Sequence, residues 1–144
     1  MKFDFVIGNP PYQETLENTS DKPVYNEFMN AAYETADAVE LITPARFLFN
    51  AGKTSKVWNQ KMLSDEYLKV LLYEPDSSKI FSNTDIKGGV AVTYRDTNKK
   101  VGAIGDFTPY QELNSILHKV KNRKDFLTIC NIIITSFAYH FTEK

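Results

Sequence analysis

The stretch Phe3-Asp4-Phe5-Val6-Ile7-Gly8-Asn9-Pro10-Pro11-Tyr12 decides the fold class of this 144-residue chain. Its first six residues form a short apolar run, which ends in a glycine, an asparagine and two prolines. This pattern is typical of a buried strand followed by a sharp break. In open α/β sheets, binding sites form beyond the carboxyl ends of the strands. We therefore expect Asn9–Tyr12 to form a site at one edge of such a sheet.

The residues after this stretch predict a strand–helix–strand unit. Residues 13–22 are polar and predict a loop. Pro23 is expected in the first turn of a helix that Ser20 or Asp21 could cap. Apolar residues then recur at helical spacing on one face: Tyr25, Phe28, Met29, Ala32, Tyr33 and Ala36. A second strand at 38–42 would complete a right-handed crossover with two parallel strands.

Further elements complete an α/β pattern. A helix is expected at 54–63, with strands at 68–73 and 89–94, and Val101–Ile104 could pair with the last of these strands. This pattern predicts the α/β class, with a mostly parallel sheet and an antiparallel C-terminal hairpin. Thr108-Pro109-Tyr110-Gln111 predicts a further helix start. The apolar tail 126–141 fits either a strand or a helix. A change of pattern near Asp106 suggests two parts, residues 1–105 and 106–144.

Composition fits a globular protein of ordinary size. Hydrophobic residues make up 42% and charged residues 24% of the chain. No apolar stretch approaches the roughly 20 residues needed to span a bilayer, and the first residues do not resemble a signal peptide. One cysteine, Cys130, cannot form an internal disulfide, so we expect a cytoplasmic protein. No metal site is predicted.

The charge is small overall but unevenly distributed. A net charge of −1 argues against strong nonspecific binding to a polyanion. Residues 1–40 hold two lysines and eight acidic residues. The stretch 98–124 contains only two acidic residues, Asp106 and Glu112, beside six basic ones: Lys99, Lys100, Lys119, Lys121, Arg123 and Lys124. This stretch would attract a phosphate backbone, or it is a solvated basic surface.

Each residue of Asn9–Tyr12 can be given a task on the exocyclic amine of a nucleobase. Such an amine is a poor nucleophile because its lone pair is delocalised into the ring. Two acceptors that bind both amine hydrogens favour a pyramidal nitrogen, and the Asn9 side-chain oxygen and the Pro10 carbonyl can supply them. Pro10 and Pro11 stiffen the loop, and Tyr12 offers a ring on which an extruded base can stack. Taken alone, the four residues could also be only a stiff turn.

Several segments, in order along the chain, resemble a known enzyme family. Residues 3–13 resemble motif IV of the N6-adenine DNA methyltransferases of bacterial restriction–modification systems. The likeness is closest to the gamma-type enzymes, including those fused to endonucleases. Residues 23–28 resemble the helix that follows in that family, and residues 41–47 the next strand with its proline exit. Residues 79–81 and 88–95 resemble a later region that supplies an aromatic residue to the target base.

The resemblance implies a substrate, a cofactor and site residues. The substrate would be double-stranded DNA, methylated on a flipped-out adenine with S-adenosylmethionine as methyl donor. Asn9, Pro10, Pro11 and Tyr12 match the catalytic motif. Tyr12 and Phe81 would stack on the two faces of the base, and Phe28 would contact the adenine of S-adenosylmethionine. Phe28 also fits the apolar core of its helix.

The resemblance also implies parts that these residues do not supply. The family binds S-adenosylmethionine with a glycine-rich loop and an acidic residue upstream of the motif, but only eight residues precede Asn9. The resemblance therefore implies the C-terminal part of a catalytic domain, with a partial Rossmann-like methyltransferase fold, and 106–144 leading toward a DNA-recognition domain. An excised segment and a shortened natural gene product both fit. Alone, the chain is expected to be inactive and to self-associate through exposed sheet edges.

Other functions fit parts of the same sequence. The tetrapeptide also occurs in methyltransferases that act on protein glutamine or on guanine in RNA. A second alternative is a non-catalytic DNA-binding module that uses the basic residues between Lys99 and Lys124. A third is a structural remnant without activity.

Overall fold

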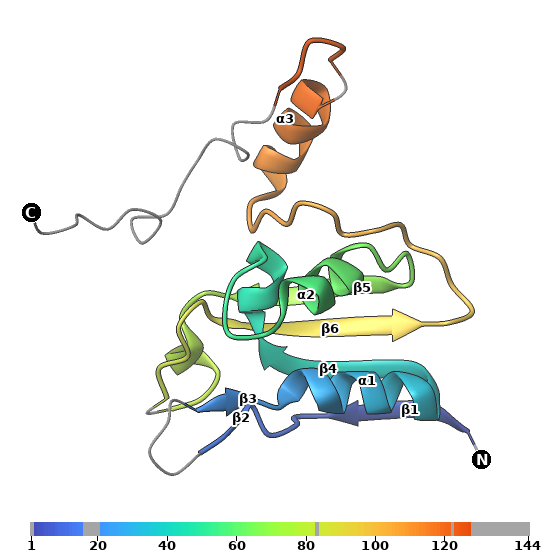
Figure 1. Ribbon diagram of the computed structural model, residues 1–144, viewed down its shortest axis with the longest axis vertical. Coiled ribbons are helices and arrows are strands. Elements are labelled where there is room, and N and C mark those ends of the chain that lie inside the picture. Colours follow the sequence, from blue (N-terminus) through green and yellow to red (C-terminus); the bar gives the residue numbers. More distant parts are fainter. Residues whose placement is uncertain (1, 16–20, 83, 122, 128–144) are drawn as a thin grey trace, which may run out of the picture. The chain divides into compact units, whose positions relative to one another are not determined.

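The computed structural model of the chain describes residues 2–15, 21–82, 84–121 and 123–127. Residues 1–107 and 108–144 form two compact units, each described here by itself. Among the described residues, the first unit contains a four-stranded sheet, a two-stranded ribbon and two α-helices, and the second contains one α-helix (Figure 1). Within the described residues, no helix is both long and apolar enough to cross a membrane.

A four-stranded mixed sheet organises the first unit. Its strands are β1 (Phe3–Gly8), β4 (Ala36–Pro44), β5 (Leu68–Glu74) and β6 (Val90–Asp96), and their spatial order is β1-β4-β6-β5. β1 pairs with β4 in parallel, whereas β6 is antiparallel to both β4 and β5. The predicted α/β class is confirmed: the sheet is mixed, with a parallel β1–β4 crossover and antiparallel strands toward the C-terminus.

The strand directions bring several loops to one end of the sheet. β1, β4 and β5 run toward this end and β6 starts from it. Residues 9–12, the 3₁₀ helices η1 (Ala45–Phe49) and η2 (Ser77–Lys79), and Gly88-Gly89 therefore lie at or beyond the same edge. We call this the carboxyl edge, because three of the four strands end there. Open α/β sheets place their sites at such an edge.

Both helices of the first unit cover the same face of the sheet. α1 (Tyr25–Thr35) and α2 (Lys56–Leu63) bury Met29 and Met62 in one apolar cluster with Val39 and Leu41 of β4. Figure 1 shows α1 running along β1 and β4. Three aromatic rings join the two helices to η1: the centroid of Phe47 lies 6.4 Å from that of Tyr25 and 5.3 Å from that of Trp58.

On the opposite face of the sheet no helix of this unit packs within the described residues, and β1 is exposed there. Phe3, Phe5 and Ile7 are 57%, 47% and 70% exposed. Leu72 of β5, which lies opposite Val92, is also half-exposed. The apolar run of β1 predicted a buried strand, and that is wrong here. β1 forms an edge of the sheet, and within the described residues it pairs only with β4.

The entry into α1 differs from the prediction. Pro23 lies in β3 (Lys22–Pro23), which pairs with β2 (Gln13–Glu14) in a short antiparallel ribbon. The helix starts two residues later, and its first flanking residue, Val24, supplies no side-chain cap. Asp21 instead accepts a hydrogen bond from the Gln13 side chain at 2.7 Å. Ser20, the other predicted cap, is outside the described residues.

The segment after β6 makes no strand. Val101 and Gly102 donate their backbone N–H groups to the Glu66 carbonyl at 2.8 and 3.0 Å, so 101–104 does not pair with β6. The second unit contains α3 (Gln111–Lys121), which begins three residues after the predicted cap Thr108. Most of the apolar tail 126–141 lies outside the described residues, as does Cys130.

Candidate active site

The loop Asn9–Tyr12 is held at both ends. β1 ties its start to the sheet, because Gly8 is in register with Leu41 of β4. Its end is tied to the start of α1, because the Val24 N–H donates to the Tyr12 carbonyl at 3.1 Å. The β2–β3 ribbon follows directly and pairs Gln13 with Pro23. The loop that contains both prolines is therefore anchored on each side.

Two acceptors of this loop are unused. The Asn9 side chain is exposed, and neither its amide nor the Pro10 carbonyl makes a hydrogen bond with any described residue. The loop lines an open hollow of about 440 Å³ together with Gln13. This arrangement can accept two hydrogen bonds from a donor such as an amine that enters the hollow.

Tyr12 and Phe81 meet beside this loop. Their ring centroids are 6.3 Å apart, and the rings are inclined by 71°, which is an edge-to-face contact. The Tyr12 hydroxyl is buried and has no hydrogen-bond partner among the described residues, and burial raises its pKa to about 12. The two predicted stacking residues are thus neighbours, although 69 positions separate them in the sequence. For a base to stack between the two rings, the rings must move apart and one of them must rotate until they are parallel.

Ser77 organises the loop that carries Phe81, a role not evident from the sequence. This buried residue of η2 donates its hydroxyl to the Thr84 carbonyl at 2.8 Å and accepts from the Ile86 N–H at 2.8 Å. Its own carbonyl accepts from the Phe81 N–H, also at 2.8 Å. One serine therefore bonds to three points of the loop. The side chain of the preceding residue, Asp76, accepts a hydrogen bond from the Ser78 N–H. An aspartate in this position is a local sequence signal for a fixed turn.

Phe28 lies on the exposed side of α1. It is 47% exposed, whereas the buried residues of this helix are Tyr25 and Met29. The alternative that Phe28 packs in the core is therefore wrong for this unit. An exposed ring near the carboxyl edge is compatible with a cofactor contact, and that role stays a prediction.

The described residues fit only part of an S-adenosylmethionine site. Phe28 offers an aromatic surface for an adenine. Five glycines have positive φ, and none of them lies in a glycine-rich loop directly after a strand: Gly52 is a single glycine between η1 and α2, Gly88-Gly89 precede β6, and Gly102 and Gly105 lie apart in the segment between β6 and α3. Groups for the methionine moiety and the ribose are not recognisable in this part of the chain. Among the described residues there is also no cluster of metal-ligating side chains.

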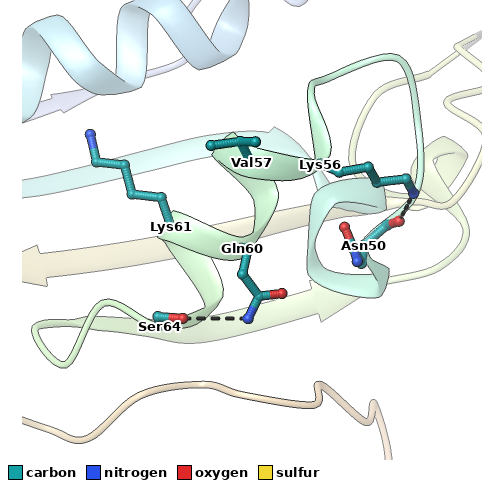
Figure 2. Close-up of a pocket in the computed structure, with 6 residues that line it drawn as sticks. All are labelled: Asn50, Lys56, Val57, Gln60, Lys61 and Ser64. Carbon is teal, nitrogen blue, oxygen red and sulfur yellow. Dashed lines mark hydrogen bonds between the residues drawn. The ribbon is translucent and has the colours of Figure 1, made fainter. Parts of the chain in front are cut away.

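A second hollow lies over α2, and it has neither the pair of free acceptors nor the pair of aromatic rings found beside the Asn9–Tyr12 loop. It has a volume of about 550 Å³ and is lined by Asn50, Lys56, Val57, Gln60, Lys61 and Ser64. Figure 2 shows that its polar groups largely bond to one another: Lys56 donates to the Asn50 carbonyl, and Gln60 donates to Ser64 at 3.4 Å. We therefore place the candidate active site at the carboxyl edge.

The fold and the loop at its edge are compatible with a partial α/β methyltransferase-like class of protein. Comparison with protein families agrees, because the model of the Eco57I restriction-modification methylases matches residues 1–81, more than half of the chain. The chain belongs to this family. The family predicted from the motif is thereby confirmed.

A curated relative matches a similar portion. An uncharacterized adenine-specific methylase of Mycoplasma pneumoniae (strain ATCC 29342 / M129 / Subtype 1) is 30% identical over 95 residues. The match covers 62% of this chain and 22% of that protein, so the chain spans about a fifth of the relative's length. No solved structure is significantly similar to the chain.

Proposed function

We propose that this chain carries the target-base side of a site-specific DNA adenine-N6 methyltransferase of a restriction–modification system. One observation carries the proposal: two unused acceptors, the Asn9 side chain and the Pro10 carbonyl, lie on a loop fixed at both ends at the carboxyl edge. The family membership of the chain supports it, and so does the adenine-specific relative.

In this proposal, each residue of the loop has a separate role in binding the adenine and its amine. Asn9 and Pro10 accept the two hydrogens of the adenine N6 amine, which leaves the nitrogen lone pair free to attack a methyl carbon. Pro10 and Pro11 keep the acceptors in place before the base arrives, so little reorganisation is needed in the transition state. Tyr12 and Phe81 part to hold the flipped base between their rings.

The methyl donor in this proposal is S-adenosylmethionine, which supplies an electrophilic methyl group on a sulfonium. Phe28 is the residue of this chain that would contact it. Because the described residues include no glycine-rich loop for its methionine part, the 144-residue chain by itself is not expected to methylate DNA. No general base is assigned, since the amine can lose its proton after transfer.

The partners follow from the same assignment. Double-stranded DNA is the substrate, which places the protein in the cytoplasm of a bacterial cell. The basic stretch 98–124 is a weaker candidate for the DNA contact, because part of its charge is already paired. Lys100 bonds to Glu66 at 2.6 Å, and Arg123 to Asp125 at 2.8 Å. A second copy of the chain is a further candidate partner, through the free edge of β1.

The test is methyl transfer by the complete gene product that carries these residues. Purified protein is incubated with tritiated S-adenosylmethionine and unmethylated genomic DNA, and the nucleosides are then analysed for N6-methyladenine. We expect methylation that Asn9→Ala lowers by about 100-fold or more, as for loss of a transition-state hydrogen bond. The 144-residue chain is assayed in parallel and is expected to transfer no methyl group.

Two controls make the result specific. Lys99→Gln removes an exposed charge at the opposite end of the sheet and should leave transfer unchanged. RNA and a protein with an accessible glutamine serve as alternative substrates. Methylation of either one but not of DNA, or full activity of Asn9→Ala, would overturn the proposal.

A further inference from the structure

Arg46 occupies a fixed position on the turn that leaves β4. Its carbonyl accepts hydrogen bonds from the N–H groups of Asn50 and Ala51, the latter at 3.1 Å. The residue before it, Ala45, donates its N–H to the Gly89 carbonyl at 3.0 Å. The backbone of Arg46 is therefore tied to two neighbouring turns at the carboxyl edge.

Two glycines make room for the aliphatic part of this side chain. A Cβ atom on Gly88 would lie 2.5 Å from the Arg46 Cγ, and one on Gly52 would lie 3.2 Å from the Arg46 Cβ. Both glycines also have positive φ angles, of 89° and 95°. A larger residue at Gly88 would collide with the stem, so the path of the side chain depends on that glycine.

The guanidinium group at the end of this stem is exposed and unused. Arg46 forms neither an ion pair nor a side-chain hydrogen bond with the described residues. Burial raises the pKa of Tyr25, while Thr54 and the charge of Arg46 act in the opposite direction. The charge is therefore near Tyr25, the residue after Val24, which bonds to the Tyr12 carbonyl. Because Arg46 follows the end of β4 and its stem lies against Gly88, the side chain lies at the same carboxyl edge as the Asn9–Tyr12 loop.

Most other cations near this edge already have partners. Lys22 bonds to Glu27 at 3.1 Å and Lys79 to Glu74 at 3.2 Å. Lys53 donates to the Asp21 carbonyl at 2.8 Å. Lys87 is exposed without a partner among the described residues, but no glycine cradle holds its flexible stem. Arg46 thus combines a fixed stem with a free charged group.

We propose that Arg46 binds a phosphate of the DNA backbone next to the adenine that enters the Asn9–Tyr12 loop. This inference rests on the proposed function. A flipped nucleotide brings its flanking phosphates to the edge where its base is bound. The guanidinium can bond two phosphate oxygens at once, and its fixed stem lowers the entropy lost on binding. Such a contact positions the DNA without reading its sequence.

The experiment measures DNA affinity as a function of salt. A fluorescent duplex is titrated with the complete gene product, and the anisotropy gives the binding constant at several sodium chloride concentrations. The slope of log K against log salt reports the number of neutralised phosphates, at about 0.9 for each. We expect Arg46→Gln to reduce this slope by about 0.9 and to weaken binding about tenfold at moderate salt.

Matched variants separate a local contact from a general loss of charge. Lys99→Gln removes one exposed charge at the opposite end of the sheet and should leave the slope unchanged. Arg46→Lys keeps the charge and should retain most of the slope. Circular dichroism and thermal unfolding check that each variant is folded.

The outcomes distinguish this inference from the function on which it rests. If the wild-type protein neither binds nor methylates DNA, the proposed function is wrong. If it does both and Arg46→Gln has the wild-type slope, only the assignment of Arg46 is wrong. If Lys99→Gln lowers the slope and Arg46→Gln does not, the basic stretch 98–124 makes the phosphate contact instead.

Discussion

Tyr12 combines a ring that the proposed site uses with a hydroxyl that stays unpaired. Burial raises the pKa of this hydroxyl from 10.0 to about 12. Below pH 10 the side chain is neutral in the folded and the unfolded chain, and its contribution to stability is complete. Between pH 10 and 12 the unfolded chain loses the proton first, so stability falls as the pH rises.

The variant Tyr12→Phe tests this assignment through the free energy of unfolding. It removes a buried hydroxyl without a partner, so at pH 7 we expect the variant to be as stable as wild type or more stable by about 1 kcal/mol. Between pH 10 and 12 it should lose less stability than wild type. Urea unfolding at pH 7, 9 and 11 measures both effects. Tyr110→Phe, at an exposed ring, controls for the loss of one hydroxyl, and equal alkaline losses in all three proteins would contradict the prediction.

At the scale of single residues, local chemistry made part of the site predictable. Pro10 and Pro11 restrict the backbone of the four-residue loop that also contains Asn9, so a stiff loop with free acceptors could be expected from the sequence. The contact of Tyr12 with Phe81 depended on the family resemblance, because no local pattern links residues so far apart. Arg46 was not singled out, since its significance depends on Gly52 and Gly88, which only the folded chain brings to it.

Among the elements, η2 and the loop behind it are the part of the site that depends most on one side chain. Ser77 is buried and bonds both the Thr84 carbonyl and the Ile86 N–H through its hydroxyl. Ser77→Ala leaves both backbone groups unpaired, which costs about 1–3 kcal/mol for each group that stays buried. The loop should therefore open more often and Phe81 should lose its fixed position.

Hydrogen exchange is the direct measurement of this effect. In Ser77→Ala we expect faster exchange of the amides at 81 and 86, with β4 amides unchanged. Ser78→Ala is the matched control, because that hydroxyl is exposed and, among the described residues, bonds only to Asp76. Uniformly faster exchange across β4 would show a global loss of stability instead, and unchanged loop amides would refute the role of Ser77.

Elements whose signals are local were predicted well, and those that depend on neighbours were not. The strand–helix–strand order and the parallel pairing of β1 with β4 follow from hydrophobic periodicity and chain connectivity. Pro23 was misplaced, because pairing with Gln13 in the β2–β3 ribbon outweighs the helix-start preference of proline. Residues 101–104 do not form the predicted strand, because the N–H groups of Val101 and Gly102 donate to the Glu66 carbonyl instead of to β6.

At the scale of the whole molecule, the two faces of the sheet in the first unit differ. α1 and α2 pack on one face of the sheet, and the other exposes apolar side chains of β1 and β5. The outer edge of β1 also has backbone groups that pair with no described strand. Free edges and exposed apolar faces favour association with another chain.

We therefore expect the 144-residue chain to self-associate as its concentration rises. Ile7→Lys should shift sedimentation profiles toward the monomer, because Ile7 is 70% exposed on β1 and a lysine there opposes edge pairing. Val57→Lys makes the same change on α2, where Val57 is 82% exposed, and should leave the profile unchanged. If the wild-type chain is monomeric at all concentrations, the exposed apolar face and the β1 edge do not cause self-association, and the prediction is wrong. Equal effects of the two variants would mean that general solubility, and not the β1 edge, controls association.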